Sequence, residues 1–210
     1  MKTDGKIWDQ FAREYENKVF SVTSSPVRRK MFLKYLKPPF ILNLGSGPLP
    51  FMNQELINKA FKIIANDISK NMIHESAKRF SHINLKFVNT DNCNLSFKDE
   101  TFDSVLSINS ILPEYRNEVD QMLNEIFRVL KNFGVFVGFF PSWEASIKAE
   151  KCFGQIEILD HSNLRVYETT GWQCYQSKET IYKHLKNSVV SVISCQKFDS
   201  MLVNQLISIK

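Results

Sequence analysis

Two glycines after a short apolar run are the first residues in this sequence whose type and spacing suggest chemistry. Residues 41–44 lead directly into Gly45, Ser46 and Gly47. A strand that ends in such a turn lets a ligand approach the backbone closely, because no side chain projects there. Position 50 is proline, so the third glycine of a dinucleotide fingerprint is missing and a pyrophosphate is not expected. The turn predicts a nucleotide-like group, with a purely structural tight turn as the alternative.

An acidic residue follows the next apolar run. Asp67 stands 22 positions after Gly45 and ends the run that begins at Lys62. A carboxylate at the tip of a second strand can accept hydrogen bonds from both ribose hydroxyls. The alternative is that Asp67 only helps to start a helix at Ser69, whose own side chain is a good N-cap. The spacing favours the ribose role.

A third polar group stands at residues 89–93, after another apolar run. Asp91 can accept from the exocyclic amine of adenine, while the backbone amide of a following residue donates to the ring. Ile68 and Met72 can enclose that ring between them. Met72 is equally well suited to packing in the core.

Short apolar runs that alternate with amphipathic segments must position these groups. This alternation predicts a parallel sheet covered by helices on both faces. Strands are expected at residues 41–44, 62–66, 84–89, 102–108 and 135–140, and helices near 50–60, 69–80, 114–131 and 143–152.

The end of the chain predicts a hairpin. After a further helix, the runs 189–198 and 201–209 are joined through Asp199 and Ser200, and so short a link can only connect antiparallel neighbours. Earlier in the chain, Gly134 is expected to close the helix 114–131. The fold class expected from these patterns is therefore α/β, with a mostly parallel sheet that has helices on both faces and ends in an antiparallel hairpin.

A leader precedes this core. Pro38 and Pro39 interrupt helical structure, and apolar residues at helical spacing predict an amphipathic helix with an aromatic stripe over residues 6–20, with another helix at 26–37. We expect one domain over 1–210, in which 1–38 form a helical lid and 39–210 a Rossmann-like core.

Four segments, taken in order, resemble the class I S-adenosylmethionine-dependent methyltransferases of the small-molecule type. They read ILNLGSGP, IIANDISKNMI, VNTDNCNLSFKDETFDSVLSIN and EIFRVLKNFGVFVGFFP. The resemblance implies S-adenosylmethionine as cofactor, with Asn109 beneath the sulfonium and Tyr15 closing from the leader. It also implies a doubly wound, seven-stranded sheet in the order 3-2-1-4-5-7-6 with an antiparallel last strand. With the residues argued above, the full set expected to bind the cofactor is Tyr15, Gly45, Ser46, Gly47, Asp67, Ile68, Met72, Asp91, Asn92, Cys93 and Asn109.

The sequence departs from this family at two places. Asn43 stands where the family usually has Asp or Glu, and Asn132-Phe133-Gly134 replaces a Pro-Gly-Gly turn. Loss of the carboxylate at position 43 weakens the electrostatic attraction to a cationic cofactor.

Aromatic residues are expected to shape the acceptor pocket, because they come from segments that overhang the carboxyl ends of the strands. The segment 171–175 is interpreted as a substrate loop and not as sheet, and no residue is assigned as a catalytic base or a metal ligand. The predicted pocket residues, each with core packing as the alternative, are Trp8, Tyr115, Phe140, Trp143, Trp172 and Tyr175.

Composition excludes several classes of protein. The chain of 210 residues is 43% hydrophobic and 23% charged, which is typical of one globular domain. No run is apolar enough for a membrane span and no signal peptide is evident, so a cytoplasmic location is expected. Four scattered cysteines are expected to be reduced thiols.

Charge bears on the choice of partner. The net charge is +5, yet residues 41–210 hold eighteen basic and eighteen acidic residues, so nucleic acid is not the expected partner. The leading hypothesis is methyl transfer to a small molecule. A catalytically silent protein that binds the cofactor or a partner for regulation or assembly is the alternative, and a nicotinamide-dependent oxidoreductase is a third. The sequence does not predict the oligomeric state.

Overall fold

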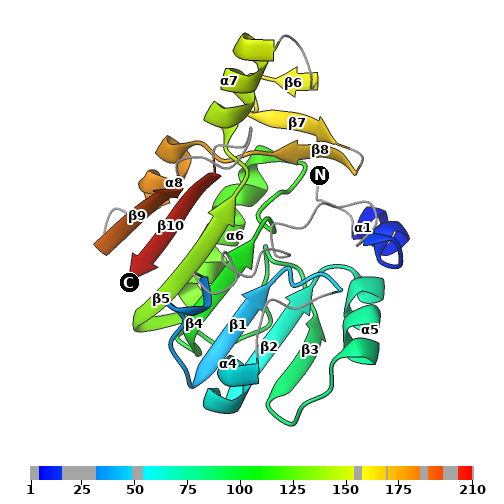
Figure 1. Ribbon diagram of the computed structural model, residues 1–210, viewed down its shortest axis with the longest axis vertical. Coiled ribbons are helices and arrows are strands. Elements are labelled where there is room, and N and C mark those ends of the chain that lie inside the picture. Colours follow the sequence, from blue (N-terminus) through cyan, green and yellow to red (C-terminus); the bar gives the residue numbers. More distant parts are fainter. Residues whose placement is uncertain are drawn as a thin grey trace.

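A seven-stranded sheet forms the centre of the computed structural model (Figure 1). The described residues are 5–15, 32–48, 54–153, 158–168, 170–184, 189–195 and 203–209. The strands follow the order β3-β2-β1-β4-β5-β10-β9. The last strand of the chain, β10, runs antiparallel to both of its neighbours in the sheet. The strand order and this hairpin confirm the fold class and the terminal hairpin that were expected.

Five parallel strands form most of this sheet: β1 (Phe40–Leu44), β2 (Lys62–Asp67), β3 (Leu85–Asn89), β4 (Phe102–Ile108) and β5 (Leu130–Phe140). The last strand, β10 (Val203–Ile209), runs antiparallel to both β5 and β9 (Val189–Cys195).

Helices cover both faces of the sheet. Successive residues of a strand point to opposite faces, and both faces carry apolar side chains that the helices bury. Leu42 and Leu44 belong to one core cluster, which α6 (Arg116–Val129) completes. Ile41 belongs to a second cluster, together with side chains of α4 (Gln54–Lys59). At the edge of the sheet that β3 forms, α5 (Lys70–Arg79) packs against β2 and β3 (Figure 1).

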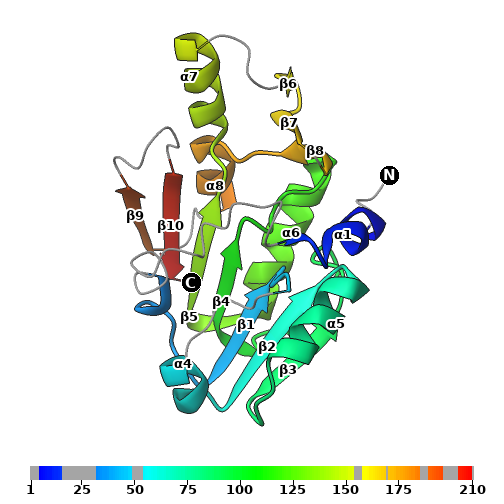
Figure 2. The same cartoon turned by 45° about the vertical axis from the view of Figure 1, so that its right-hand side comes forward.

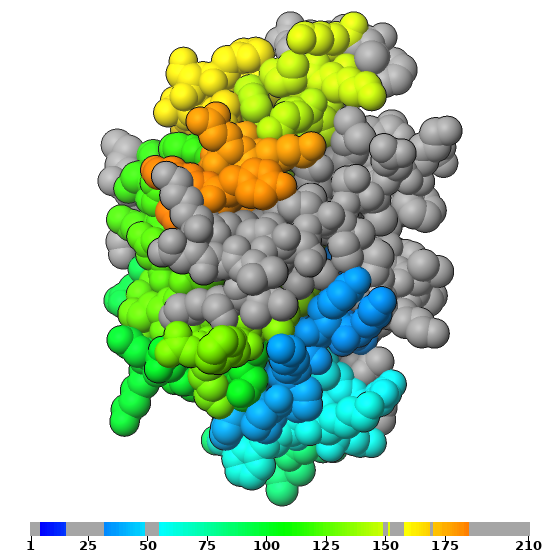
Figure 3. Space-filling model, turned by 90° about the vertical axis from the view of Figure 1, so that its left-hand side faces the viewer, coloured from blue at the N-terminus to red at the C-terminus, as the bar shows by residue number. Residues whose placement is uncertain are grey.

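A cap stands above the carboxyl ends of the parallel strands, as Figure 2 shows. It contains α7 (Trp143–Phe153), α8 (Lys178–His184) and a second, antiparallel sheet of β6 (Ile158–Asp160), β7 (Arg165–Glu168) and β8 (Gly171–Cys174). In the space-filling view of Figure 3 these segments form the upper end of the molecule, and residues 32–48 lie at the lower end with α4.

Two local expectations were wrong. The segment 171–175 was interpreted as a loop, but Gly171–Cys174 is strand β8. Its register with β7 places Trp172 opposite Tyr167, and the two rings meet edge to face at 5.3 Å, which stabilises a strand pair too short to show alternation in the sequence. Gly134 does not close α6, since that helix ends at Val129 and Gly134 lies inside β5.

The leader is described in part. Helix α1 (Lys6–Phe11) lies within the predicted helix 6–20. Turn residues 12–14 follow it, residue 15 is helical again, and 16–20 fall outside the described residues. Of the predicted helix 26–37, only 32–37 is described. Helix α1 packs against α5, at the right of Figure 1. Among the described residues, no helix is long and apolar enough to cross a membrane.

Candidate functional site

A cavity opens at the carboxyl ends of β1, β2 and β4, where parallel α/β sheets bind their ligands. It measures about 630 Å³, open solvent included. Its lining comes from the leader, the turn after β1, the start of α5, the loop after β3 and the segment that joins β4 to α6. The lining residues are Trp8, Tyr15, Gly45, Gly47, Asp67, Ile68, Met72, Asn92, Asn109, Ser110, Leu112, Pro113 and Met122.

The two glycines of the turn after β1 serve different purposes. Both have positive φ, +56° at Gly45 and +60° at Gly47. A Cβ on Gly45 would lie 2.3 Å from Cβ of Ser110, so this glycine allows the turn to pack against the end of β4. Among the described residues, the nearest neighbour of a Cβ on Gly47 would be Tyr15, at 3.9 Å, so this glycine faces open space in the cavity. Both glycines line the cavity, and the close packing at Gly45 gives that glycine a structural reason as well.

Asp67 lies buried at the end of β2, with both carboxylate oxygens in hydrogen bonds. Oδ2 accepts from the backbone N–H of Gly47 at 2.9 Å, and Oδ1 accepts from that of Ser69 at 2.9 Å. Burial raises the pKa of Asp67 to about 6, although these two N–H groups act against the shift. Asp67 therefore joins the glycine turn to the start of α5 and also faces the cavity.

The loop after β3 brings one polar side chain to the cavity. Asn92 is buried, and its Oδ1 accepts from Nδ2 of Asn66 at 2.9 Å. Asp91 is half-buried and turns its carboxylate back to the N–H of Cys93, 2.8 Å away. Neither Asp91 nor Cys93 lines the cavity. Ser46 also lies outside the lining, and its N–H donates to the carbonyl of Asn66 at 2.8 Å.

The leader closes one side of the cavity. Asp9 on α1 accepts from the hydroxyl of Ser69 at 2.5 Å and from the N–H of Asn71 at 3.0 Å, so it caps the first turn of α5 from another element. This contact brings Trp8 and Tyr15 to the cavity wall. Burial, together with the negative charge of Asp67, raises the pKa of Tyr15 to about 12, so its phenol stays protonated.

The segment after β4 supplies residues that sequence reasoning missed. Ser110, Leu112 and Pro113 line the cavity, and the hydroxyl of Ser110 donates to the carbonyl of Leu44 at 2.7 Å. Their position just beyond a strand at the carboxyl edge was the available signal. Met122 also lines the cavity, although its place in the apolar stripe of α6 indicated only core packing.

Of the six aromatic residues predicted for the acceptor pocket, the cavity lining includes Trp8 alone. Phe140 is 4% exposed and belongs to the core cluster of Leu42 and Leu44, and Trp143 packs against His161. The other three lie at the cap: Trp172 and Tyr175 are in or next to β8, and Tyr115 precedes α6. Aromatic residues in the segments that overhang the strand ends can therefore pack against one another and not line the cavity.

The lining fits the groups of S-adenosylmethionine. A buried carboxylate at Asp67 can accept from hydroxyls and attract a cation, and the open side of Gly47 exposes backbone to a ligand. Oδ1 of Asn109, a residue that lines the cavity with φ +49°, is buried and has no hydrogen-bond partner among the described residues. An unpaired buried acceptor of this kind is costly unless a ligand or a water supplies a donor.

Comparison with known proteins agrees with this geometry. Residues 41–134 match the family model described as a methyltransferase domain. A crystal structure of a protein from Pyrococcus horikoshii superposes with a TM-score of 0.70 at 25% identity, over 93% of this chain and 98% of that one. A methyltransferase from Methanosarcina mazei that depends on S-adenosylmethionine superposes with a TM-score of 0.61 at 17% identity, over 89% and 97% of the two chains, and so shares the fold.

Two curated relatives match parts of the chain. An uncharacterised protein of Methanocaldococcus jannaschii is 33% identical over 144 residues, which are 68% of this chain and 58% of that protein. The human mitochondrial arginine-hydroxylase NDUFAF5 is 34% identical over 103 residues, which are 48% of this chain and 28% of that protein. The chain thus spans less than two thirds of the length of either relative.

Proposed function

We propose that this chain, whose residues 41–134 match the methyltransferase-domain family model, is a class I S-adenosylmethionine-dependent methyltransferase that binds this cofactor in the cavity and transfers its methyl group to a small acceptor molecule. The observation that carries the proposal is the carboxylate of Asp67, buried beside the open Gly47 at the carboxyl edge of the sheet. When bound, S-adenosylmethionine supplies an electrophilic methyl group on a positively charged sulfur.

The proposed roles follow from the atoms that each residue offers. Each oxygen of Asp67 already accepts one backbone N–H and retains a lone pair for a ribose hydroxyl. Asn92, with the loop that carries Asp91 and Cys93, would face adenine, and Ile68 and Met72 would enclose the ring. Asn109 would lie near the sulfur, and Tyr15 would close the leader side.

The acceptor proposed is one that needs no base from the protein. Among the described residues of the lining, Asp67 and Tyr15 are the titratable ones. Tyr15 stays protonated, since its pKa is raised to about 12, and Asp67 is committed to the ribose. Methyl transfer then depends on alignment in a dry pocket, which Trp8, Leu112 and Pro113 help to form. A neutral amine, a thiolate or a stabilised carbanion is such an acceptor.

A second candidate is a protein of this fold that does not transfer methyl groups. Two observations favour it. Asn43 replaces the acidic residue usual in the family, and within the described part of the chain its buried Nδ2 has no hydrogen-bond partner. The human relative carries the name of a hydroxylase, although it matches less than half of this chain. Under this reading the protein binds the cofactor or a partner for regulation or assembly.

Calorimetry tests the first step of the proposal. The wild-type protein should bind S-adenosylhomocysteine, and Asp67→Ala should weaken that binding at least tenfold, by about 1.4 kcal/mol. Asp103→Ala is the control, because Asp103 is a partly buried carboxylate that pairs with Lys131 near the start of β4, at the end of that strand away from the cavity. No heat with the folded wild-type protein would defeat the proposal, and an unchanged dissociation constant would reject the role of Asp67.

Turnover separates the two candidates. Release of S-adenosylhomocysteine from S-adenosylmethionine, followed over a panel of amines, thiols and carbon acids, would exclude the silent candidate. Binding without release, across acceptors of all three kinds, would favour it.

A further inference from the structure

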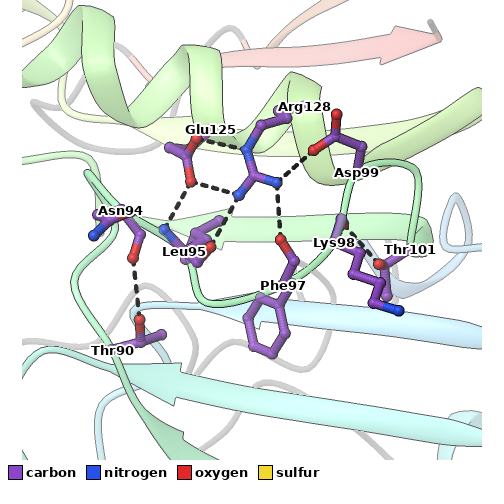
Figure 4. A network of polar contacts seen from close by, with 9 residues as sticks. All are labelled: Thr90, Asn94, Leu95, Phe97, Lys98, Asp99, Thr101, Glu125 and Arg128. Atoms are coloured by element: carbon purple, nitrogen blue, oxygen red, sulfur yellow. Dashed lines mark hydrogen bonds and ion pairs between the residues drawn. The ribbon is translucent and has the colours of Figure 1, made fainter.

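A single arginine on the outer face of α6 binds the loop that follows β3 (Figure 4). Arg128 donates from Nε and Nη2 to the two oxygens of Glu125, each at 2.7 Å. Its Nη1 donates to the carboxylate of Asp99 at 2.7 Å and to the carbonyl of Phe97 at 2.8 Å, and its Nη2 donates to the carbonyl of Leu95 at 2.9 Å. These bonds use all five N–H groups of the guanidinium.

Glu125 extends the contact to the backbone of the same loop. Its Oε2 also accepts from the N–H of Leu95 at 2.7 Å. Leu95 is therefore held through both its N–H and its carbonyl, which fixes the orientation of its peptide groups relative to α6. The side chains of Arg128 and Glu125 are 31% and 18% exposed, so the pair is partly shielded from water.

The segment held in this way is continuous with the cavity wall. Thr90 donates through its hydroxyl to the carbonyl of Asn94 at 3.4 Å, which closes the loop between β3 and Leu95 (Figure 4). Asn92 lies within this closed stretch and lines the cavity. The loop is thus fixed at one end by β3 and at the other by Arg128, with the residue proposed to face adenine between them.

We propose that Arg128 is a positioning residue for the adenine end of the cofactor, which it never touches: by holding residues 95–99 against α6 it fixes Asn92 in the cavity wall. This inference rests on the proposed function. A lysine cannot replace the arginine, because an ammonium lacks the planar fork that matches two carboxylates and two carbonyls together.

The test compares two folded variants with the wild-type protein. Arg128→Lys retains the charge and loses the fork. The control, Lys131→Met, breaks the ion pair to Asp103, which joins the start of β5 to the start of β4 and includes no residue of the loop 90–99. Its two side chains are similarly exposed, at 35% and 23%. Calorimetry measures the dissociation constants of S-adenosylhomocysteine and of its hypoxanthine analogue, S-inosylhomocysteine. The ratio of the two constants reports adenine recognition, which a general loss of stability would not change below the unfolding temperature.

We expect Arg128→Lys to weaken S-adenosylhomocysteine binding about tenfold and to reduce the preference for adenine, while Lys131→Met leaves both within twofold. An unchanged constant and an unchanged ratio in folded Arg128→Lys would overturn the inference alone. Failure of the wild-type protein to bind either ligand would instead overturn the proposed function. If Arg128→Lys does not fold, Glu125→Gln carries the same expectation. It removes the negative charge and replaces one of the two acceptor oxygens by an NH2 group, so the three bonds from Arg128 and Leu95 cannot all be kept.

Discussion

At the scale of single residues, Asp67 shows how the environment changes a group that the sequence had already singled out. Its position at the tip of β2 follows from the pattern of the chain. Its pKa does not, because burial raises it to about 6 while two backbone N–H groups oppose the shift. The carboxylate is thus close to its titration point in mildly acidic solution, which gives the proposed site a testable pH dependence.

Binding of S-adenosylhomocysteine should weaken as the pH falls through about 6. Ribose hydroxyls donate to the ionised carboxylate, and protonation below the pKa of about 6 removes that acceptor. We expect the affinity of the wild-type protein at pH 5 to be about tenfold lower than at pH 7, measured by calorimetry. Asp67→Asn should bind weakly with little change over this range. Equal wild-type affinities at pH 5 and pH 7 would argue against a ribose role for this carboxylate.

At the scale of elements, the turn between β1 and α4 is held by its neighbours as much as by its own glycines. Ser110 at the end of β4 packs against Gly45 and donates to the carbonyl of Leu44. From the other side, the hydroxyl of Ser76 on α5 donates to the carbonyl of Gly47 at 3.0 Å. Residues of neighbouring elements therefore hold the turn on two sides. Because the two glycines have different neighbours, they should respond differently to substitution.

Gly45→Ala should cost several kcal/mol of folding free energy, because left-handed strain of about 1–2 kcal/mol adds to overpacking of about 1–3 kcal/mol against Ser110. Gly47→Ala should cost only the strain, about 1–2 kcal/mol, and should weaken cofactor binding. Urea unfolding measures both costs. The double variant Gly45→Ala with Ser110→Gly should recover part of the loss, and a failure to recover any would count against this packing explanation.

At the scale of the whole molecule, the cavity draws its wall from elements on both sides of the sheet and from the leader. Helix α1 is joined to α5 through Asp9, and the loop after β3 is joined to α6 through Arg128. A ligand in the cavity would contact all of these parts together. Binding should therefore stabilise the fold as a unit.

A hundredfold excess of S-adenosylhomocysteine over its dissociation constant should stabilise the protein by about 2.7 kcal/mol, which corresponds to a rise in Tm of about 5–10 °C for a domain of this size. NADH at the same concentration should have no effect, since Pro50 replaces the third glycine of a dinucleotide site. Differential scanning fluorimetry measures both. A larger shift with NADH would favour the oxidoreductase hypothesis over methyl transfer.

The sequence by itself determined the alternation of parallel strands with helices and the antiparallel hairpin, because periodicity and the short terminal link limit how the strands can pair. The order of the strands followed from the resemblance of its motifs to the methyltransferase family. The sequence also indicated Gly47, Asp67 and Asn92, since residues at the carboxyl ends of parallel strands meet at one edge. The tertiary structure alone decided which overhanging segments reach the cavity. Trp172 and Tyr175 pack within the cap, whereas Leu112 and Pro113 line the cavity. Such contacts depend on how separate elements pack in space, and no local spacing in the chain records that.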